Sequence, residues 1–344
     1  MDENFLINTY EKLLVNYEKS QGIIAVNSRN AVVDNTLPIS VEIHLSNRCN
    51  LNCEWCVDRE IRQSKKELSR DVLYKVINEF AHKGIGLTIE GGGEPTVHPF
   101  FEEFVFECKK SGIKLGLITN GVKKISVEVI KKFDWIRVSV DSANADEYAR
   151  EKGCDCFKKV IENVKYISRN APNVVLSIGF VLTNRNWTNL ENLFLNLKDA
   201  NIDHYRFRTV EENESLCPDE KTISIVNEKL NCLSEKYKVK IIKSLVSDVD
   251  ERNNKGLPCV AHSLRAIIHA DGNVLLCEKR RHDIIILGNI YENDFNEIWY
   301  SEKRKEITEK LLCKENQRGC EICRITKFNE LFNRLKDQKT KNFI

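Results

Sequence analysis

Three closely spaced cysteines constrain this chain more than any other feature. Cys49, Cys53 and Cys56 lie in the run Ser-Asn-Arg-Cys-Asn-Leu-Asn-Cys-Glu-Trp-Cys, directly after an apolar segment with the pattern of a strand. Thiolates on one short loop can hold corners of a four-iron cluster, and a complete cubane takes four of them. Three thiolates leave one iron open to a ligand from outside the protein. The alternative is a zinc site, with a fourth ligand such as His44 or His98.

A glycine-rich turn is the second motif. Leu-Thr-Ile-Glu at 87–90 has the character of a strand and leads into Gly-Gly-Gly-Glu-Pro-Thr at 91–96. Glycine at a strand end lets the backbone approach a ligand closely. The phosphate-loop pattern GxxxxGK[ST] is absent. Glu94 would repel a phosphate, whereas a carboxylate suits an ammonium group.

The order of strand, cysteine loop, helix, strand and Gly-Gly-Gly-Glu-Pro resembles the radical S-adenosylmethionine (SAM) superfamily. The resemblance implies that the open iron is chelated by the amino and carboxylate groups of SAM. It further implies that the reduced cluster cleaves SAM to a 5'-deoxyadenosyl radical, which abstracts a hydrogen atom from the substrate. The residues expected on this basis to contact SAM are Trp55, Gly92, Gly93, Glu94, Ser139, Asp141 and Asn184.

Strand-like and helical segments alternate after residue 40. The expected strands are 41–45, 86–89, 114–119, 136–140, 174–181 and 204–208. Such alternation predicts an α/β fold with a parallel sheet, and six strands suit the partial (β/α)6 barrel of radical SAM enzymes. By analogy with closed α/β barrels, the chemistry is expected at the C-terminal ends of the strands, where both motifs lie.

The predicted organisation has five parts. These are an N-terminal helix (3–18) and lead-in over 1–40, the barrel over 41–211, a polar connection over 212–257 with a helix at 223–237, an auxiliary domain over 258–330 with a helix at 295–312, and a polar tail over 331–344.

A second cysteine set lies in the auxiliary domain. Cys259 precedes a hairpin predicted around Ala-Asp-Gly-Asn, Cys277 ends its second strand, and Cys320 and Cys323 form a Cys-x2-Cys pair. Four thiolates are enough to close a cubane. The pattern resembles the twitch domain, the shorter relative of the SPASM domain of radical SAM enzymes. Cys313 is a substitute ligand, and a four-cysteine zinc site is the alternative.

Some remaining side chains are weaker candidates. Cys154, Cys156 and Cys217 lie on predicted loops, and some radical SAM epimerases use such a thiol as a hydrogen-atom donor. Arg206, Arg208, Arg280 and Arg281 are candidates for substrate or SAM carboxylate binding, because a guanidinium binds carboxylate or phosphate through two parallel hydrogen bonds. The alternatives are structural roles and solvent-exposed positions.

Composition narrows the setting. The net charge of +2 on 344 residues gives no electrostatic case for nucleic acid binding. We read no secretory signal and no apolar run long enough to cross a membrane. With thirteen cysteines, metal binding in the cytoplasm is therefore favoured over disulfides.

Two clusters suggest an oxidation. After hydrogen abstraction, a carbon radical beside a hydroxyl or amine needs a one-electron acceptor, and an auxiliary cluster provides one. The prediction is therefore dehydrogenation of a small polar sugar-like or aminocyclitol-like molecule, with flavodoxin or ferredoxin as the electron donor. The alternatives are a maturase that cross-links or epimerises a ribosomal peptide, and a non-enzymatic metal-binding scaffold.

Overall fold

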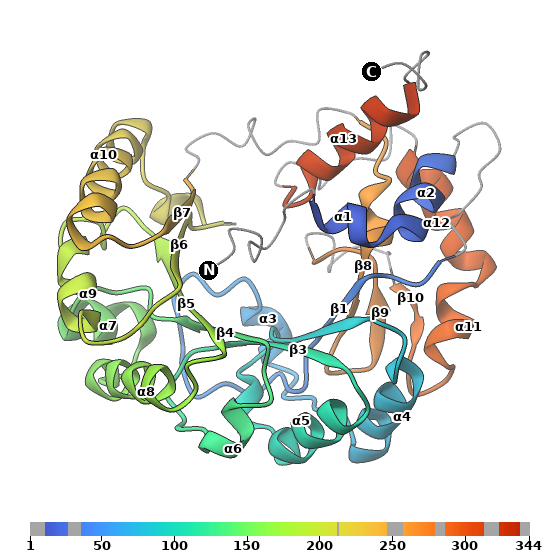
Figure 1. The fold of residues 1–344 in the computed structure, drawn as a ribbon, viewed down its shortest axis with the longest axis horizontal. Coiled ribbons are helices and arrows are strands. Elements are labelled where there is room, and N and C mark those ends of the chain that lie inside the picture. Colours follow the sequence, from blue (N-terminus) through green and yellow to red (C-terminus); the bar gives the residue numbers. More distant parts are fainter. Residues whose placement is uncertain are drawn as a thin grey trace. The chain divides into compact units, whose positions relative to one another are not determined.

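The computed structural model (Figure 1) describes residues 11–26, 36–211, 213–245, 257–278, 286–312 and 323–337. The chain divides into two compact units, and the N-terminal lead-in belongs to the same unit as the C-terminal residues. One unit is Met1–Glu42 with Val249–Ile344, and the other, the α/β unit, is Ile43–Asp248. Strand β1 (Ser40–Ile43) runs from the first unit into the second.

The α/β unit is built on a parallel sheet, as predicted. Its successive neighbours are β2 (Gly86–Ile89), β3 (Lys114–Thr119), β4 (Trp135–Ser139), β5 (Val175–Leu182), β6 (His204–Thr209) and β7 (Ile241–Ser244). The last strand was not predicted, because 212–257 was interpreted as a polar connection. It is a short strand, Ile-Ile-Lys-Ser, with two adjacent apolar residues and no alternating pattern that would have marked it.

Helices separate these strands along the chain, and all of them except the first lie on the outer side of the sheet (Figure 1). They are α3 (Arg59–Arg62), α4 (Arg70–Phe80), α5 (Phe101–Lys110), α6 (Val127–Ile130), α7 (Ala145–Lys152), α8 (Phe157–Asn170), α9 (Leu190–Leu197) and α10 (Glu220–Tyr237). Helix α4 shows why they form. Ser69 caps its first turn by accepting from Val72 N, and one apolar stripe from Val72 to Phe80 is buried. Each fully buried aliphatic or aromatic side chain contributes roughly 1.5–3 kcal/mol.

The other unit, which contains the predicted auxiliary domain, holds an antiparallel sheet. The predicted hairpin is β8 (Arg265–Ile268) with β9 (Asn273–Leu275), and β9 also pairs with the unpredicted β10 (Ile286–Asn289). The helix expected over 295–312 is two helices, α11 (Phe295–Trp299) and α12 (Glu302–Leu312), which are separated at Tyr300 and Ser301.

The helices at the two ends of the chain share one core. The expected helix over 3–18 is α1 (Glu11–Val15) followed by α2 (Tyr17–Ala25), and residues 1–10 lie outside the described residues. Leu13 is buried, but Leu14 is 78% exposed. The unpredicted helix α13 (Thr326–Asp337) packs on the same core through Phe328 and Phe332. The polar tail predicted from residue 331 therefore does not begin there.

Among the residues that the structure describes, no helix is long and apolar enough to cross a membrane.

Candidate active site

The loop that carries the first three cysteines is fastened to the end of helix α7. Cys49, Cys53 and Cys56 follow β1 and are all half-buried. The backbone N–H groups of Asn52 and Glu54 donate to the carbonyls of Lys152 and Glu151 at 3.1 and 3.3 Å. The loop thus takes its conformation from a segment about a hundred residues away in the chain, through bonds that use backbone groups at a helix C-terminus.

Burial and nearby charges shift the pKa values of the thiols of this loop in opposite directions. Burial raises the pKa of Cys49, against lowering contributions from the Leu51 backbone and from Arg62. Burial also raises the pKa of Cys53, and the nearby ammonium of Lys152 acts against it. Metal ligands must be deprotonated, so the two cations favour the thiolate forms that iron requires.

The glycines of the second motif pack against this loop. Gly91 and Gly92 have φ of 73° and 61°, which L side chains rarely adopt. A Cβ on Gly93 would lie 1.9 Å from the carbonyl oxygen of Arg48. Gly93 N and Glu94 N donate to Ser46 O and Arg48 O at 2.7 and 2.8 Å. The glycine-rich turn and the cysteine loop therefore form one body, and SAM binding by Gly92 and Gly93 stays a prediction.

The carboxylate of Glu94 is 3% exposed and fully engaged by the protein. It accepts hydrogen bonds from Thr96 N, Thr96 Oγ1, Thr119 Oγ1 and Asn120 N, at 2.6 to 3.2 Å. Burial raises its pKa, and these donors oppose that shift. The carboxylate ties the turn to the end of β3. That structural role differs from the expected contact with an ammonium group, which stays a prediction.

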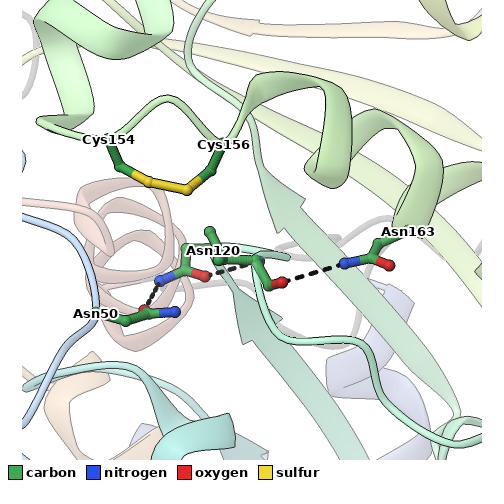
Figure 2. The surroundings of a disulfide bond; sticks show 6 residues. Asn50, Asn120, Cys154, Cys156 and Asn163 are labelled. Carbon is green, nitrogen blue, oxygen red and sulfur yellow. Dashed lines mark hydrogen bonds between the residues drawn. A yellow bond between two sulfur atoms is a disulfide. The ribbon is translucent and has the colours of Figure 1, made fainter.

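Asn120 links the end of β3 to the first cysteine. Its Nδ2 donates to Asn50 Oδ1 at 2.7 Å and lies 3.9 Å from Cys49 Sγ, while its Oδ1 accepts from Val122 N. Figure 2 shows the pair of Asn120 and Asn50, with the disulfide of Cys154 and Cys156 on a neighbouring loop. Sequence reasoning missed Asn120, although its place directly after a predicted strand was a usable signal.

Lys152 is the most informative residue that sequence reasoning missed. Its ammonium contacts the carboxylate of Asp141, and both side chains are at most 4% exposed. It also lies 5.6 Å from the ring centroid of Trp55 and donates to Ser139 O at 3.3 Å. Burial lowers the pKa of this ammonium. The negative charges of Asp141 and Cys53 raise it by a larger amount, so the net shift of the pKa is upward. Lys152 is therefore a buried cation among the cysteine loop and two expected SAM contacts.

Asp141 adopts a left-handed backbone conformation at the end of β4. Its φ is 57°, in a region that few residues other than glycine adopt and that Asp and Asn enter most readily among them. Its Oδ1 accepts from Val181 N at 2.7 Å, and Asn186 Nδ2 donates to its carbonyl at 3.0 Å. These contacts hold that conformation in place. Ribose contacts by Ser139 and Asp141 stay predictions.

Cys217 lies in a small apolar cluster beside the cysteine loop. Trp55, Val181, Val210 and Leu216 form this cluster, and Cys53 and Cys217 pack against it. Asn184 fastens the loop of Cys217, because its backbone N and its Nδ2 donate to Leu216 O and Ser215 O, each at 2.9 Å. A contact of Asn184 with SAM stays a prediction, as does substrate binding by Arg208 on β6.

Cys154 and Cys156 differ from Cys217. They are joined in a disulfide (Figure 2). A disulfide sulfur carries no hydrogen, so neither residue is a hydrogen-atom donor in this form. The sequence interpretation, which favoured metal binding over disulfides, did not foresee the bond.

The zinc alternative finds no support at His98. Its Nε2 lies 3.0 Å from Leu68 O, and its Nδ1 accepts from Phe100 N at 3.2 Å. His44 is buried against Gly91, on which a Cβ would lie 2.0 Å from His44 Nε2. Within the described residues, no three potential ligand side chains converge as a single metal ion requires. The ligands of a cubane bind different iron atoms, so they surround the cluster at larger separations than the ligands of one ion.

The second cysteine set is partly described. Cys259, Cys277 and Cys323 are each half-buried, and Cys259 and Cys323 pack against one hydrophobic core. Glu278, which follows Cys277, forms ion pairs with Arg265 Nη1 at 2.8 Å and with Arg324 Nη1, next to Cys323, at 3.1 Å. Cys313, Cys320, Arg280 and Arg281 lie outside the described residues. The Glu278 carboxylate thus holds together the segments that carry Cys277 and Cys323.

Comparison with known proteins identifies the class. The model of the radical SAM superfamily matches residues 43–197, and that of the SPASM iron–sulfur cluster-binding domain matches residues 259–324. The chain therefore belongs to the radical SAM superfamily and carries a C-terminal SPASM domain. It is an enzyme whose cofactors are SAM and two [4Fe–4S] clusters, and the thiols of both cysteine sets fit such clusters.

The similar proteins carry the names of different reactions. The chain is 26% identical over 274 residues to a probable GTP 3',8-cyclase of Sulfurisphaera tokodaii, covering 74% of this chain and 86% of that protein. It is 24% identical over 304 residues to a tungsten-containing aldehyde ferredoxin oxidoreductase cofactor-modifying protein of Pyrococcus furiosus, covering 76% and 80%. Streptococcus suis SuiB bound to its precursor peptide SuiA shares the fold, with a TM-score of 0.65, 17% identity and coverage of 97% and 81%.

Proposed function

We propose that this enzyme carries out the two-electron oxidation of a small polar substrate, with the SPASM-domain cluster as acceptor of the second electron. The observation that supports this most directly is the presence of two separate cysteine sets with different capacities. The first offers three thiols on one loop, and the second combines Cys259, Cys277 and Cys323 with a further cysteine in the Cys-x2-Cys pair.

The residues around the first set place two cations and an aromatic ring near the cysteines. When bound, the cluster and SAM supply one-electron cleavage of SAM and a radical that takes a hydrogen atom from carbon. Lys152 and Arg62 place positive charge near the thiolates, and Trp55 is only 8% exposed and excludes water from beside Cys53. The chain orients and shields the reaction, while the cofactor carries the chemistry.

The names of the relatives favour a small polar substrate. GTP and an enzyme cofactor are named in the two curated relatives, each of which the chain covers by more than two thirds. The proposed reaction is dehydrogenation at a carbon bearing a hydroxyl or amine, as in a sugar or aminocyclitol. Reduction of the first cluster requires a one-electron donor such as flavodoxin or ferredoxin.

A peptide maturase is the second candidate, and Cys217 favours its epimerase form. Its side chain shares an apolar cluster with Cys53 and Trp55. A thiol in that place is suited to return a hydrogen atom to a carbon radical. SuiB, one of several structural neighbours, is described with a precursor peptide.

Iron content and SAM cleavage test the assignment of the two sites. Anaerobically reconstituted protein should hold about eight iron atoms, and Cys49, Cys53 and Cys56 changed together to alanine should leave about four. This triple variant should form no 5'-deoxyadenosine. Cys232→Ala, at an exposed position, is the matched control. Persistent 5'-deoxyadenosine formation by the triple variant would contradict the proposal.

The substrate class is tested with an extract of cells that were grown in deuterated medium. A substrate fraction transfers deuterium to 5'-deoxyadenosine, and protease treatment abolishes this transfer only if the substrate is a peptide. The same fraction, prepared from cells grown without deuterium, is then converted in heavy water. We expect a protease-resistant substrate and a product two electrons more oxidised, without solvent deuterium on carbon. One incorporated deuterium that disappears in Cys217→Ala would establish the epimerase instead.

A further inference from the structure

Asn329 on helix α13 directs its side-chain amide at a cysteine of the SPASM domain. Its Nδ2 lies 3.6 Å from Cys259 Sγ, within hydrogen-bond range for sulfur. The side chain is fully buried at 0% exposure. Helix α13 therefore brings a polar group to the sulfur across 70 residues of sequence.

The orientation of this amide is fixed by its other end. Oδ1 accepts hydrogen bonds from Val260 N at 3.0 Å and from Ala261 N at 2.7 Å. A flipped amide would place its own N–H groups against those two donors, which excludes the flip. The group that faces Cys259 is therefore the NH2 group, which can only donate.

The next turn of the helix reinforces this arrangement. Asn333 Nδ2 donates to Pro258 O at 3.1 Å, and the backbone N–H of Cys259 donates to Leu311 O at 3.1 Å. The backbone at Cys259 is thus held on both sides, which keeps the residue next to the Asn329 amide. The analogous amide in the α/β unit, Asn120, lies farther from its sulfur, at 3.9 Å from Cys49 Sγ.

We propose that Asn329 is a positioning residue that raises the reduction potential of the SPASM-domain cluster. Hydrogen bonds to cluster sulfurs are among the determinants of iron–sulfur potentials. A donor at Cys259 stabilises the reduced cluster, because that state places more negative charge on sulfur. The inference rests on the proposed function, since a raised potential suits a cluster that accepts an electron from a substrate radical.

The test is the variant Asn329→Asp. A carboxylate keeps an acceptor oxygen for Val260 N and Ala261 N but replaces the donor toward Cys259 with a second oxygen. The potential is measured by redox titration followed by electron paramagnetic resonance, in the 344-residue chain with Cys49, Cys53 and Cys56 changed to alanine, so that only this cluster contributes. We expect at least a tenfold loss in the equilibrium constant for reduction, equivalent to about 59 mV for one electron.

Two further variants separate loss of the donor from added charge. Asn329→Ala removes the donor without adding charge, and it should also lower the potential. Asn333→Asp makes the same amide-to-carboxylate change one turn away, without a sulfur contact, and its shift should be smaller than that of Asn329→Asp. Equal potentials in the parent, Asn329→Asp and Asn329→Ala proteins would overturn the proposal.

A measurement on the parent protein guards against variants that do not fold. With asparagine labelled by 15N in its side chain, pulsed electron paramagnetic resonance of the reduced cluster should show a coupling to an asparagine nitrogen. Absence of this coupling would overturn the role of Asn329. Analysis of iron and zinc content separates failure of the Asn329 proposal from failure of the proposed function. Zinc at the site would refute electron acceptance itself.

Discussion

The ammonium of Lys152 contacts the carboxylate of Asp141 in the interior of the α/β unit, and the backbone carbonyl of the same lysine accepts a hydrogen bond from Asn52 in the cysteine loop. One residue therefore joins the end of β4 to the loop that carries Cys49, Cys53 and Cys56. The contact places a positive charge near Cys53, the predicted iron ligand, and it compensates the buried charge of Asp141.

Removing this lysine charge should destabilise the protein strongly. Lys152→Met leaves the Asp141 carboxylate buried without its cation, and breaking a buried ion pair on one side costs about 3–5 kcal/mol. Urea unfolding of anaerobic protein measures the loss. The double variant Lys152→Met with Asp141→Asn should recover part of it, and Lys152→Arg should be milder than Lys152→Met. A loss below about 1 kcal/mol, as is typical of exposed pairs, would refute the assigned role.

Gly93→Ala should impair SAM cleavage more than Gly84→Ala. A Cβ at Gly93 would lie 1.9 Å from Arg48 O, whereas one at Gly84 has no heavy atom within 4 Å. Gly84 has a φ of 70°, so its variant should cost only about 1 kcal/mol from backbone strain. The measurements are 5'-deoxyadenosine formation and urea unfolding. Equal activity of the two variants would show that the turn tolerates displacement from the cysteine loop.

Glu278→Gln should lower the iron content of the SPASM domain. The change removes the charge that pairs with Arg265 and Arg324, and it leaves two guanidinium groups close together between Cys277 and Cys323. We expect iron to fall from about eight toward four atoms per chain, with SAM cleavage retained. Glu292→Gln, at an exposed position, is the control. Full iron content in Glu278→Gln would show that the ligand segments come together without this clamp.

The protein should lose stability as the pH falls from about 6.5 to 4. Burial, followed by the charges of Arg137 and Arg206, lowers the pKa of His204 to about 4. The unfolded chain binds the proton more readily, so the contribution of His204 is complete above its unfolded pKa and is lost toward its folded pKa. The shift corresponds to roughly 3 kcal/mol.

His204→Phe keeps an aromatic ring that cannot titrate, so it should flatten this pH dependence. Urea unfolding at a series of pH values provides the measurement. His82→Asn, at an exposed residue with a φ of 58° that asparagine tolerates, is the control and should leave the profile unchanged. An unchanged profile in His204→Phe would assign the acid sensitivity to other groups.

The sequence by itself determined the fold class and the class of chemistry. Cys49, Cys53 and Cys56 lie within eight positions, and the glycine turn is one continuous run, so their residue types and spacing carry the chemical information locally. Strands β1 to β6 were predictable for the same reason, because hydrophobic periodicity is a property of short segments.

Only the tertiary structure decided which side chains support those motifs. Asn329 contacts Cys259 across 70 residues of sequence. Lys152, the last residue of α7, contacts Asp141, which lies between β4 and α7. A lone lysine or asparagine has no local pattern that marks it, because its role depends on partners that folding brings together. Packing likewise decided that Glu94 binds the end of β3, that Cys217 packs against the same apolar cluster as Cys53, and that Cys154 and Cys156 form a disulfide.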